Sequence, residues 1–177
     1  MKICFPILQS AVGRLPVFLL FGMALCVAHA APAQSAPEKK PLPMTQHASG
    51  TFDVKVTPIA PDDTAGGAAI GRYALDKQIH GDLEGTSKGE MLSAGDPKTG
   101  TAGAVAIEYV TGTLHGRSGS FALQHFSTMS GGKYDMKIIV VPGSGTGELA
   151  GIEGTFTILI AGGKHSYEFD YTLPESK

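Results

Sequence analysis

The chain has 177 residues, with 14 Lys and Arg against 16 Asp and Glu and a formal net charge of −2 at pH 7. Because it has neither a basic run nor an excess of basic residues, it lacks the electrostatic signature of a nucleic-acid-binding protein. It contains 24 glycines and no Asn, so glycine must form nearly all the turns that need a positive φ.

The first 30 residues are expected to be a signal peptide. Lys2 and Arg14 are their only charged residues, and the apolar stretch 15–27 has the length of a signal-peptide core but is short for a membrane span. Ala28-His29-Ala30 fits an A-x-A cleavage site, so we expect cleavage after Ala30. This predicts export to the periplasm or the medium, with no stable membrane insertion after cleavage. An uncleaved membrane anchor is the alternative.

Residues 31–47 are rich in Pro and Ala and predict a flexible linker, and the folded domain is expected over residues 48–177. Both cysteines, Cys4 and Cys26, precede the cleavage site. The mature chain would therefore have neither a disulfide framework nor a thiolate metal site, and its core alone would stabilise the fold.

Alternation of apolar and polar residues predicts eight strands and no long helix. Phe52, Val54 and Val56, for example, share one face of the first strand. Residues 61–67 are expected to form a loop, and residues 143–152 one helical turn capped by Thr146. The expected strands are residues 51–58, 70–80, 81–92, 103–114, 120–129, 134–141, 154–160 and 165–173. Short strands joined by glycine turns predict an all-β protein, an antiparallel eight-stranded barrel or a sandwich.

The pentapeptide G-x-L-x-G occurs three times, at residues 81–85, 112–116 and 147–151. Glycines at these positions suit the bends of a closed sheet, and each central leucine can point into the core. We expect the mouth of the barrel to be lined by polar residues from these corners. Eight strands close into a barrel just wide enough for side chains or one small ligand.

Several longer motifs extend from about residue 50 to residue 173. They are Leu75-Asp76-Lys77 and residues 81–87, 116–121, 123–125, 140–147 and 151–152. Together they resemble a bacterial family, domain of unknown function 3224, of the allene-oxide-cyclase barrel type. The resemblance implies an eight-stranded barrel with a central cavity and no particular activity. Better-understood barrels of this type handle oxidised fatty acids or phenolic radicals, an analogy at the level of the fold alone.

Sequence motifs for known cofactors and metals do not fit their structural context. Gly145-x-Gly147-x-x-Ala150 spells a dinucleotide fingerprint, but it lies outside a βαβ unit and predicts a turn instead. The histidines have no metal-ligand spacing, and the chain has no G-x-S-x-G nucleophile elbow. We therefore expect no metal and no cofactor.

The hairpin over residues 103–129 holds the candidate site residues. Glu108 and His125 could transfer protons or hold the polar end of a ligand, with Tyr109 as a further donor. The candidate ligand-binding residues are Gln124, Arg117, Phe121 and Leu123.

The register of this hairpin decides which candidates share a face. A two-residue loop at Arg117-Ser118 would place Glu108 on the face of His125, whereas a three-residue loop would place Tyr109 there. The simplest alternative is that Glu108 is an exposed strand charge, His125 a core or surface histidine, and Arg117 a solvated turn residue.

Three hypotheses on function follow. The first is a binding protein that holds one small, largely apolar ligand in the barrel. The second is an isomerase or cyclase that uses Glu108 and His125 as an acid–base pair, which requires both side chains at one cavity. The third is a structural protein that forms homo-oligomers through the apolar strand at residues 137–141.

Overall fold

The computed structural model describes residues 43–63 and 70–174. The expected signal peptide, most of the expected linker and most of the expected 61–67 loop lie outside these residues and stay predictions. Within the described residues, no helix is long and apolar enough to cross a membrane.

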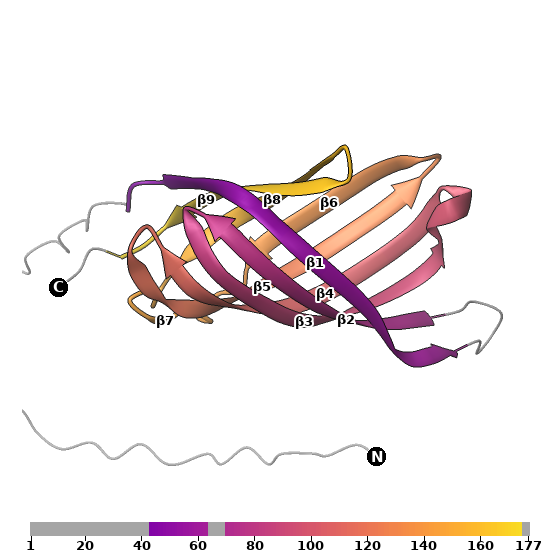
Figure 1. Cartoon of the computed structure of the whole chain (residues 1–177), viewed down its shortest axis with the longest axis horizontal. Coiled ribbons are helices and arrows are strands. Elements are labelled where there is room, and N and C mark those ends of the chain that lie inside the picture. Colours follow the sequence, from indigo (N-terminus) through magenta and orange to yellow (C-terminus); the bar gives the residue numbers. More distant parts are fainter. Residues whose placement is uncertain (1–42, 64–69, 175–177) are drawn as a thin grey trace, which may run out of the picture. The chain divides into compact units, whose positions relative to one another are not determined.

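The described chain folds into nine strands and one short 3₁₀ helix (Figure 1). In chain order they are β1 Gln46–Asp63, β2 Ile70–Gly81, β3 Leu83–Asp96, η2 Pro97–Thr99, β4 Thr101–Leu114, β5 Arg117–Ser130, β6 Lys133–Val140, β7 Thr146–Gly147, β8 Glu153–Ala161 and β9 Lys164–Thr172. The eight strands expected from the alternation are all present, most of them longer than predicted.

These strands form a closed antiparallel barrel of eight strands. Strands follow one another in the order β4-β3-β2-β1-β9-β8-β6-β5, and pairing of β4 with β5 closes the ring. Where the ring is closed, no strand has the unpaired edge that an open sheet would expose. The two-residue strand β7 adds to β5, where Gly119 pairs with Gly147.

The helical turn expected within residues 143–152 is not formed. Thr146 and Gly147 pair with β5 instead, and Gly147 has a φ of 59°, which ends a right-handed helical path. The short helix lies elsewhere, at η2, where the Asp96 side chain caps it by accepting from the Lys98 N–H at 2.9 Å.

One end of the barrel is filled with side chains. The central leucines of the three pentapeptides, Leu83, Leu114 and Leu149, are fully buried there, as expected. They pack with an aromatic cluster in which Phe169 stacks on Phe121 and contacts its neighbours on β8 and β9. The hydroxyl group of buried Tyr167 accepts a hydrogen bond from the Leu83 N–H at 2.9 Å. Large buried side chains therefore fill this end of the barrel at the close packing typical of protein interiors.

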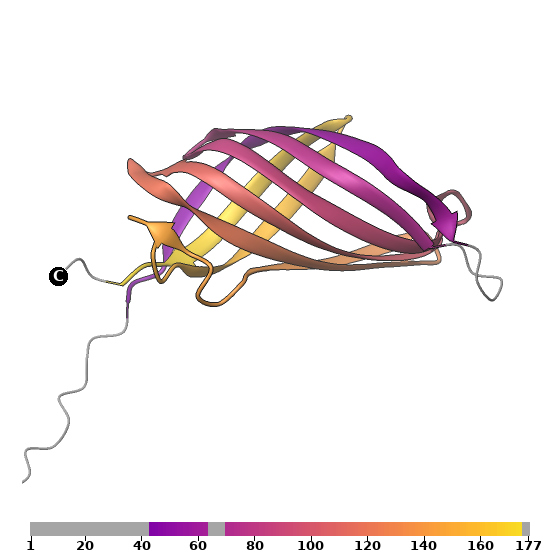
Figure 2. The same ribbon diagram turned by 90° about the horizontal axis from the view of Figure 1, so that it is seen from below.

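The other end of the barrel is open on one side, because the β8–β9 hairpin is short. Pairing of β9 with β1 stops at Phe52 and His165, although β1 continues to Asp63. Strands β6 and β8 pair only through Ile138 with Phe156 and Ile139 with Thr155, and Figure 2 shows them diverging beyond that point. The long strands β1 to β5 therefore extend beyond the end of the closed ring, and we call the open space along their inner face the trough.

Candidate functional site

The β4–β5 hairpin decides which candidate residues face the barrel interior. Its loop consists of His115 and Gly116, whose φ angles are 46° and 81°, as a type I′ turn requires. Both loops expected from the sequence began at residue 117, whereas the observed loop begins at residue 115, so both expected loop positions are wrong. Glu108 pairs with Leu123, and Ala106 pairs with His125, which places Glu108 and His125 on the same inner face.

Glu108 is the centre of a buried polar cluster. It is 1% exposed, and its Oε1 accepts hydrogen bonds from Nζ of Lys77 at 2.6 Å and from Nε2 of His125 at 2.7 Å. Its Oε2 accepts a hydrogen bond from the Ser87 hydroxyl at 2.6 Å. The cluster joins four adjacent strands, β2 to β5, across the middle of the barrel. The alternative reading of Glu108 as an exposed charge is wrong.

Glu108 is an ionised acceptor in this cluster. Burial by itself would raise the pKa of its carboxyl group, but the hydrogen bond from His125 and the charge of Lys77 outweigh burial and lower the pKa to about 2. An ionised carboxylate can only accept hydrogen bonds, so Nε2 of His125 must carry a proton. In neutral His125, Nδ1 is then the unprotonated nitrogen, and it has no hydrogen-bond partner among the described residues.

A cavity of about 190 Å³ adjoins the cluster at the open end of the barrel. Lys77 and His125, which are 6% and 9% exposed, form its polar end. Most of its other lining is apolar and includes Phe52, Val54, Leu75, Met91, Met136, Ile158 and Ile160. A second cavity of about 250 Å³ shares four lining residues with it and extends along the trough towards η2. The mouth of the barrel was expected at the pentapeptide corners. Both cavities lie at the opposite end of the barrel, so this expectation is corrected.

The remaining predicted site residues lie away from this cavity. Tyr109 is 50% exposed on the outer face, because it alternates with Glu108 along β4. Phe121 and Leu123 are fully buried in the packed end, and Arg117 begins β5 beside the His115–Gly116 turn. These four residues therefore do not line the inner cavity, and the expectation that Tyr109 donates into the barrel is corrected.

Gln124 lies on the outer face of the barrel. It borders a wide, open groove of about 620 Å³ over β2 to β5, together with the ion pair between Arg72 and Glu90. This groove is larger than the inner cavity but lies on the surface, and its charged residues are already paired. The inner cavity is the better candidate because it lies on the inner face of the barrel and combines apolar walls with buried polar groups.

Lys77 and Ser87 belong to the site but were not predicted. The sequence held one signal for Lys77, since it occupies the same face of β2 as Tyr73, Leu75 and Ile79, where a charge is out of place. Ser87 carried no comparable signal, because serine is common on both faces of strands.

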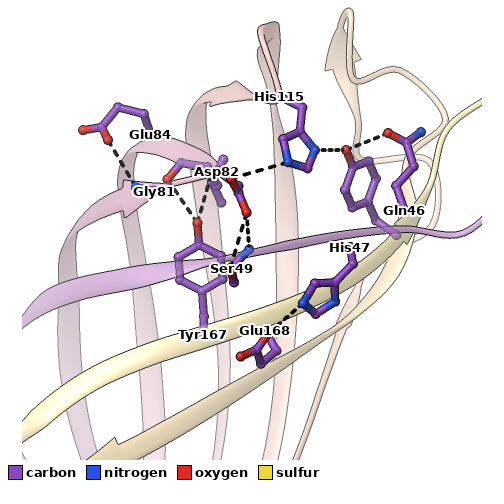
Figure 3. A network of polar contacts seen from close by, with 11 residues as sticks. Gln46, His47, Ser49, Gly81, Asp82, Glu84, His115, Tyr167 and Glu168 are labelled. Carbon is purple, nitrogen blue, oxygen red and sulfur yellow. Dashed lines mark hydrogen bonds and ion pairs between the residues drawn. The ribbon is translucent and has the colours of Figure 1, made fainter.

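A second polar network lies at the packed end of the barrel (Figure 3). The Ser49 N–H donates to Oδ2 of Asp82 at 2.8 Å, a contact that lowers the pKa of this carboxyl group. The Tyr171 hydroxyl donates to Gln46 and lies 2.8 Å from Nδ1 of His115. These contacts tie β1 and β9 to the neighbouring turns at the surface, so we assign the network a structural role. Among the described residues, no three His, Cys, Asp or Glu side chains are grouped as metal ligands.

Comparison with known proteins agrees with the fold but identifies no activity. The model of a family described as "Protein of unknown function (DUF3224)" matches residues 48–171. A protein with unknown function from Shewanella oneidensis MR-1, which belongs to the DUF3224 family and has a crystal structure, is 48% identical in sequence to this chain. The match covers 75% of this chain and 100% of that one, with a TM-score of 0.70. No curated protein matches the chain.

Proposed function

The chain belongs to DUF3224, a family of proteins of unknown function, and from this premise we propose that its barrel binds one small, largely apolar ligand. The observation that supports the proposal is the apolar cavity of about 190 Å³ with two buried polar side chains at its end. An apolar cavity of about 150 Å³ holds a benzene molecule, so this space suits a single ring or a short acyl chain. The adjoining trough leaves room for a longer molecule.

Native mass spectrometry of the protein purified from its host tests this proposal. We expect an additional small-molecule mass that is lost on denaturation, or binding of the neutral probes phenylethanol and octanol to the empty protein. In the variant Met136→Trp, the indole ring would fill the cavity from β6. The affinity for phenylethanol and octanol should then fall by about tenfold or more.

The matched control for this experiment is Lys137→Trp. Lys137 is the next residue on β6 and faces outward, where it pairs with Phe126, so the same indole ring would leave the cavity free. Binding should be retained in this variant. A bare protein that binds neither probe, or equal binding by both variants, would count against the cavity.

A second candidate function, an isomerase, is favoured by the contact between Glu108 and His125 at one cavity. Glu108 would orient the imidazole ring, as a carboxylate does in a catalytic triad. Nδ1 of His125 would take a proton from the carbon next to a ligand carbonyl, the C–H electron pair would form the enolate, and the Lys77 ammonium group would stabilise the enolate oxygen. With a β,γ-unsaturated carbonyl compound the enolate is a dienolate, and return of the same proton from Nδ1 to its γ carbon would complete the isomerisation.

Deuterium exchange into the ketone phenylacetone, followed by NMR in D₂O, tests this chemistry. His125→Asn should slow protein-catalysed exchange by roughly a hundredfold, the usual contribution of a general base. Tyr109→Phe, on the outer face, should leave the rate unchanged. Exchange that is absent in the wild type, or insensitive to His125→Asn, would exclude this mechanism.

Homo-oligomer formation is the third candidate, and the outer face of the barrel supports it. Val105, Ile107, Tyr109 and Phe126 are each about half exposed on adjacent strands, next to the outward side chain of Ile139. Exposed apolar groups that form one patch often mark an interface. The native mass spectrum described above also gives the number of subunits, and a monomer at high concentration would argue against this assembly.

A further inference from the structure

We propose that the ligand is an apolar molecule with a single carboxylate head group, bound between the Lys77 ammonium group and Nδ1 of His125, and that this histidine gains a proton when the ligand binds. The inference rests on the proposed ligand-binding function and adds the chemical class of the ligand. It depends on the hydrogen-bonding capacity and the charge balance of the polar end of the cavity.

Hydrogen-bonding capacity favours a ligand with acceptor atoms. The ammonium group of Lys77 has three N–H donors, but within the described residues it makes one hydrogen bond, to Glu108. The ammonium group also lies over the ring of Phe52, whose centroid is 4.9 Å from Nζ. A buried ammonium group with unused donors at the end of an apolar cavity is satisfied by an anionic oxygen.

Charge balance explains why a proton must accompany the ligand. The single charge of Glu108 is already balanced by Lys77, so a second buried anion needs a second cation. Protonated His125 supplies that charge, and because its Nε2 is already bonded to Glu108, its Nδ1 is the donor that it can offer to a ligand in the cavity that it lines. With Glu108 and the ligand as the two anions, Lys77 and His125 as the two cations, the site is neutral.

The other titratable groups around the cavity do not replace His125 in this role. His165 of β9 lies at the rim, where its ring packs on Phe52 with 5.1 Å between the centroids. Tyr134 of β6 is 54% exposed at the opening. Among the described titratable groups at this end of the cavity, three are almost completely buried: Lys77, Glu108 and His125.

Isosteric probes separate the head group from the apolar part of the ligand. We expect phenylacetate and octanoate to bind about tenfold or more tightly than phenylacetamide, phenylethanol and octanol. Calorimetry in buffers of different ionisation enthalpy should show uptake of about one proton per carboxylate bound at about pH 8. The neutral probes should bind without proton uptake.

Lys77→Met should remove the preference for carboxylates but retain binding of the neutral probes, whereas the outward-facing Lys137→Met should retain both. If Lys77→Met fails to fold, the proton uptake of the wild-type protein on carboxylate binding still tests the head-group inference. Equal affinities for charged and neutral probes, or carboxylate binding without proton uptake, would overturn the head-group inference and leave the apolar site in place. Failure of all probes to bind would overturn both proposals.

Discussion

Replacing Glu108 by alanine is expected to lower the free energy of unfolding by roughly 3–5 kcal/mol, the usual loss when one member of a buried ion pair is removed. The substitution leaves the Lys77 ammonium group 6% exposed without a counter-charge and removes the acceptor of His125 and Ser87. Urea unfolding followed by circular dichroism measures the change. We expect a lower midpoint with little change in slope.

Two controls separate loss of the buried charge from loss of any glutamate. Glu90→Ala removes a paired glutamate from the outer face of adjacent β3, where the side chain is 57% exposed, and should change stability by about 1 kcal/mol or less. Lys77→Met combined with Glu108→Gln removes both charges and should recover part of the loss. A Glu108→Ala protein as stable as Glu90→Ala would show that the cluster contributes nothing to the fold.

Acidification is expected to remove about 3 kcal/mol of stability through Glu108 alone. The pKa of this carboxyl group is lowered in the folded protein to about 2 from its ordinary 4.5. Between these two values the unfolded chain binds more protons than the folded one, so stability falls as the pH falls. The contribution is complete above about pH 4.5 and is lost as the pH drops to about 2.

The wild type must be compared with Glu108→Gln, because Asp82 and Glu84 also have lowered pKa values and act in the same direction. Unfolding free energies measured between about pH 2 and pH 6 should converge for the two proteins towards acid pH. Parallel curves would mean that the pKa of Glu108 is the same in the folded and the unfolded protein.

The elements of this fold could be predicted from the sequence because strand periodicity is a local property. Phe52 and Val54 alternate with polar residues, and the three pentapeptide leucines occupy buried corners. The shared face of Glu108 and His125 could be predicted only as one of two cases, because a shift of one residue exchanges the two faces of a strand.

The site itself depends on pairings that no local pattern determines. The segment 112–119 contains three glycines, and the chain turns at His115, a non-glycine residue with a positive φ. Lys77 meets Glu108 from a strand two positions away in the sheet, so its role appears only once β2, β3 and β4 are in register. The open side results from the length of the β8–β9 hairpin, which fixes where the ring ends.

The pairing of β1 with β9 has a consequence for the order of folding. It joins the first and last strands of the domain, from Gln46 with Tyr171 to Phe52 with His165, whereas β2 to β5 pair with their neighbours in the chain. Contacts between residues far apart in the chain form late, because closing a long loop is entropically unfavourable. A growing polypeptide can therefore assemble the meander early, but the aromatic cluster that includes Phe169 waits until synthesis of the domain is complete.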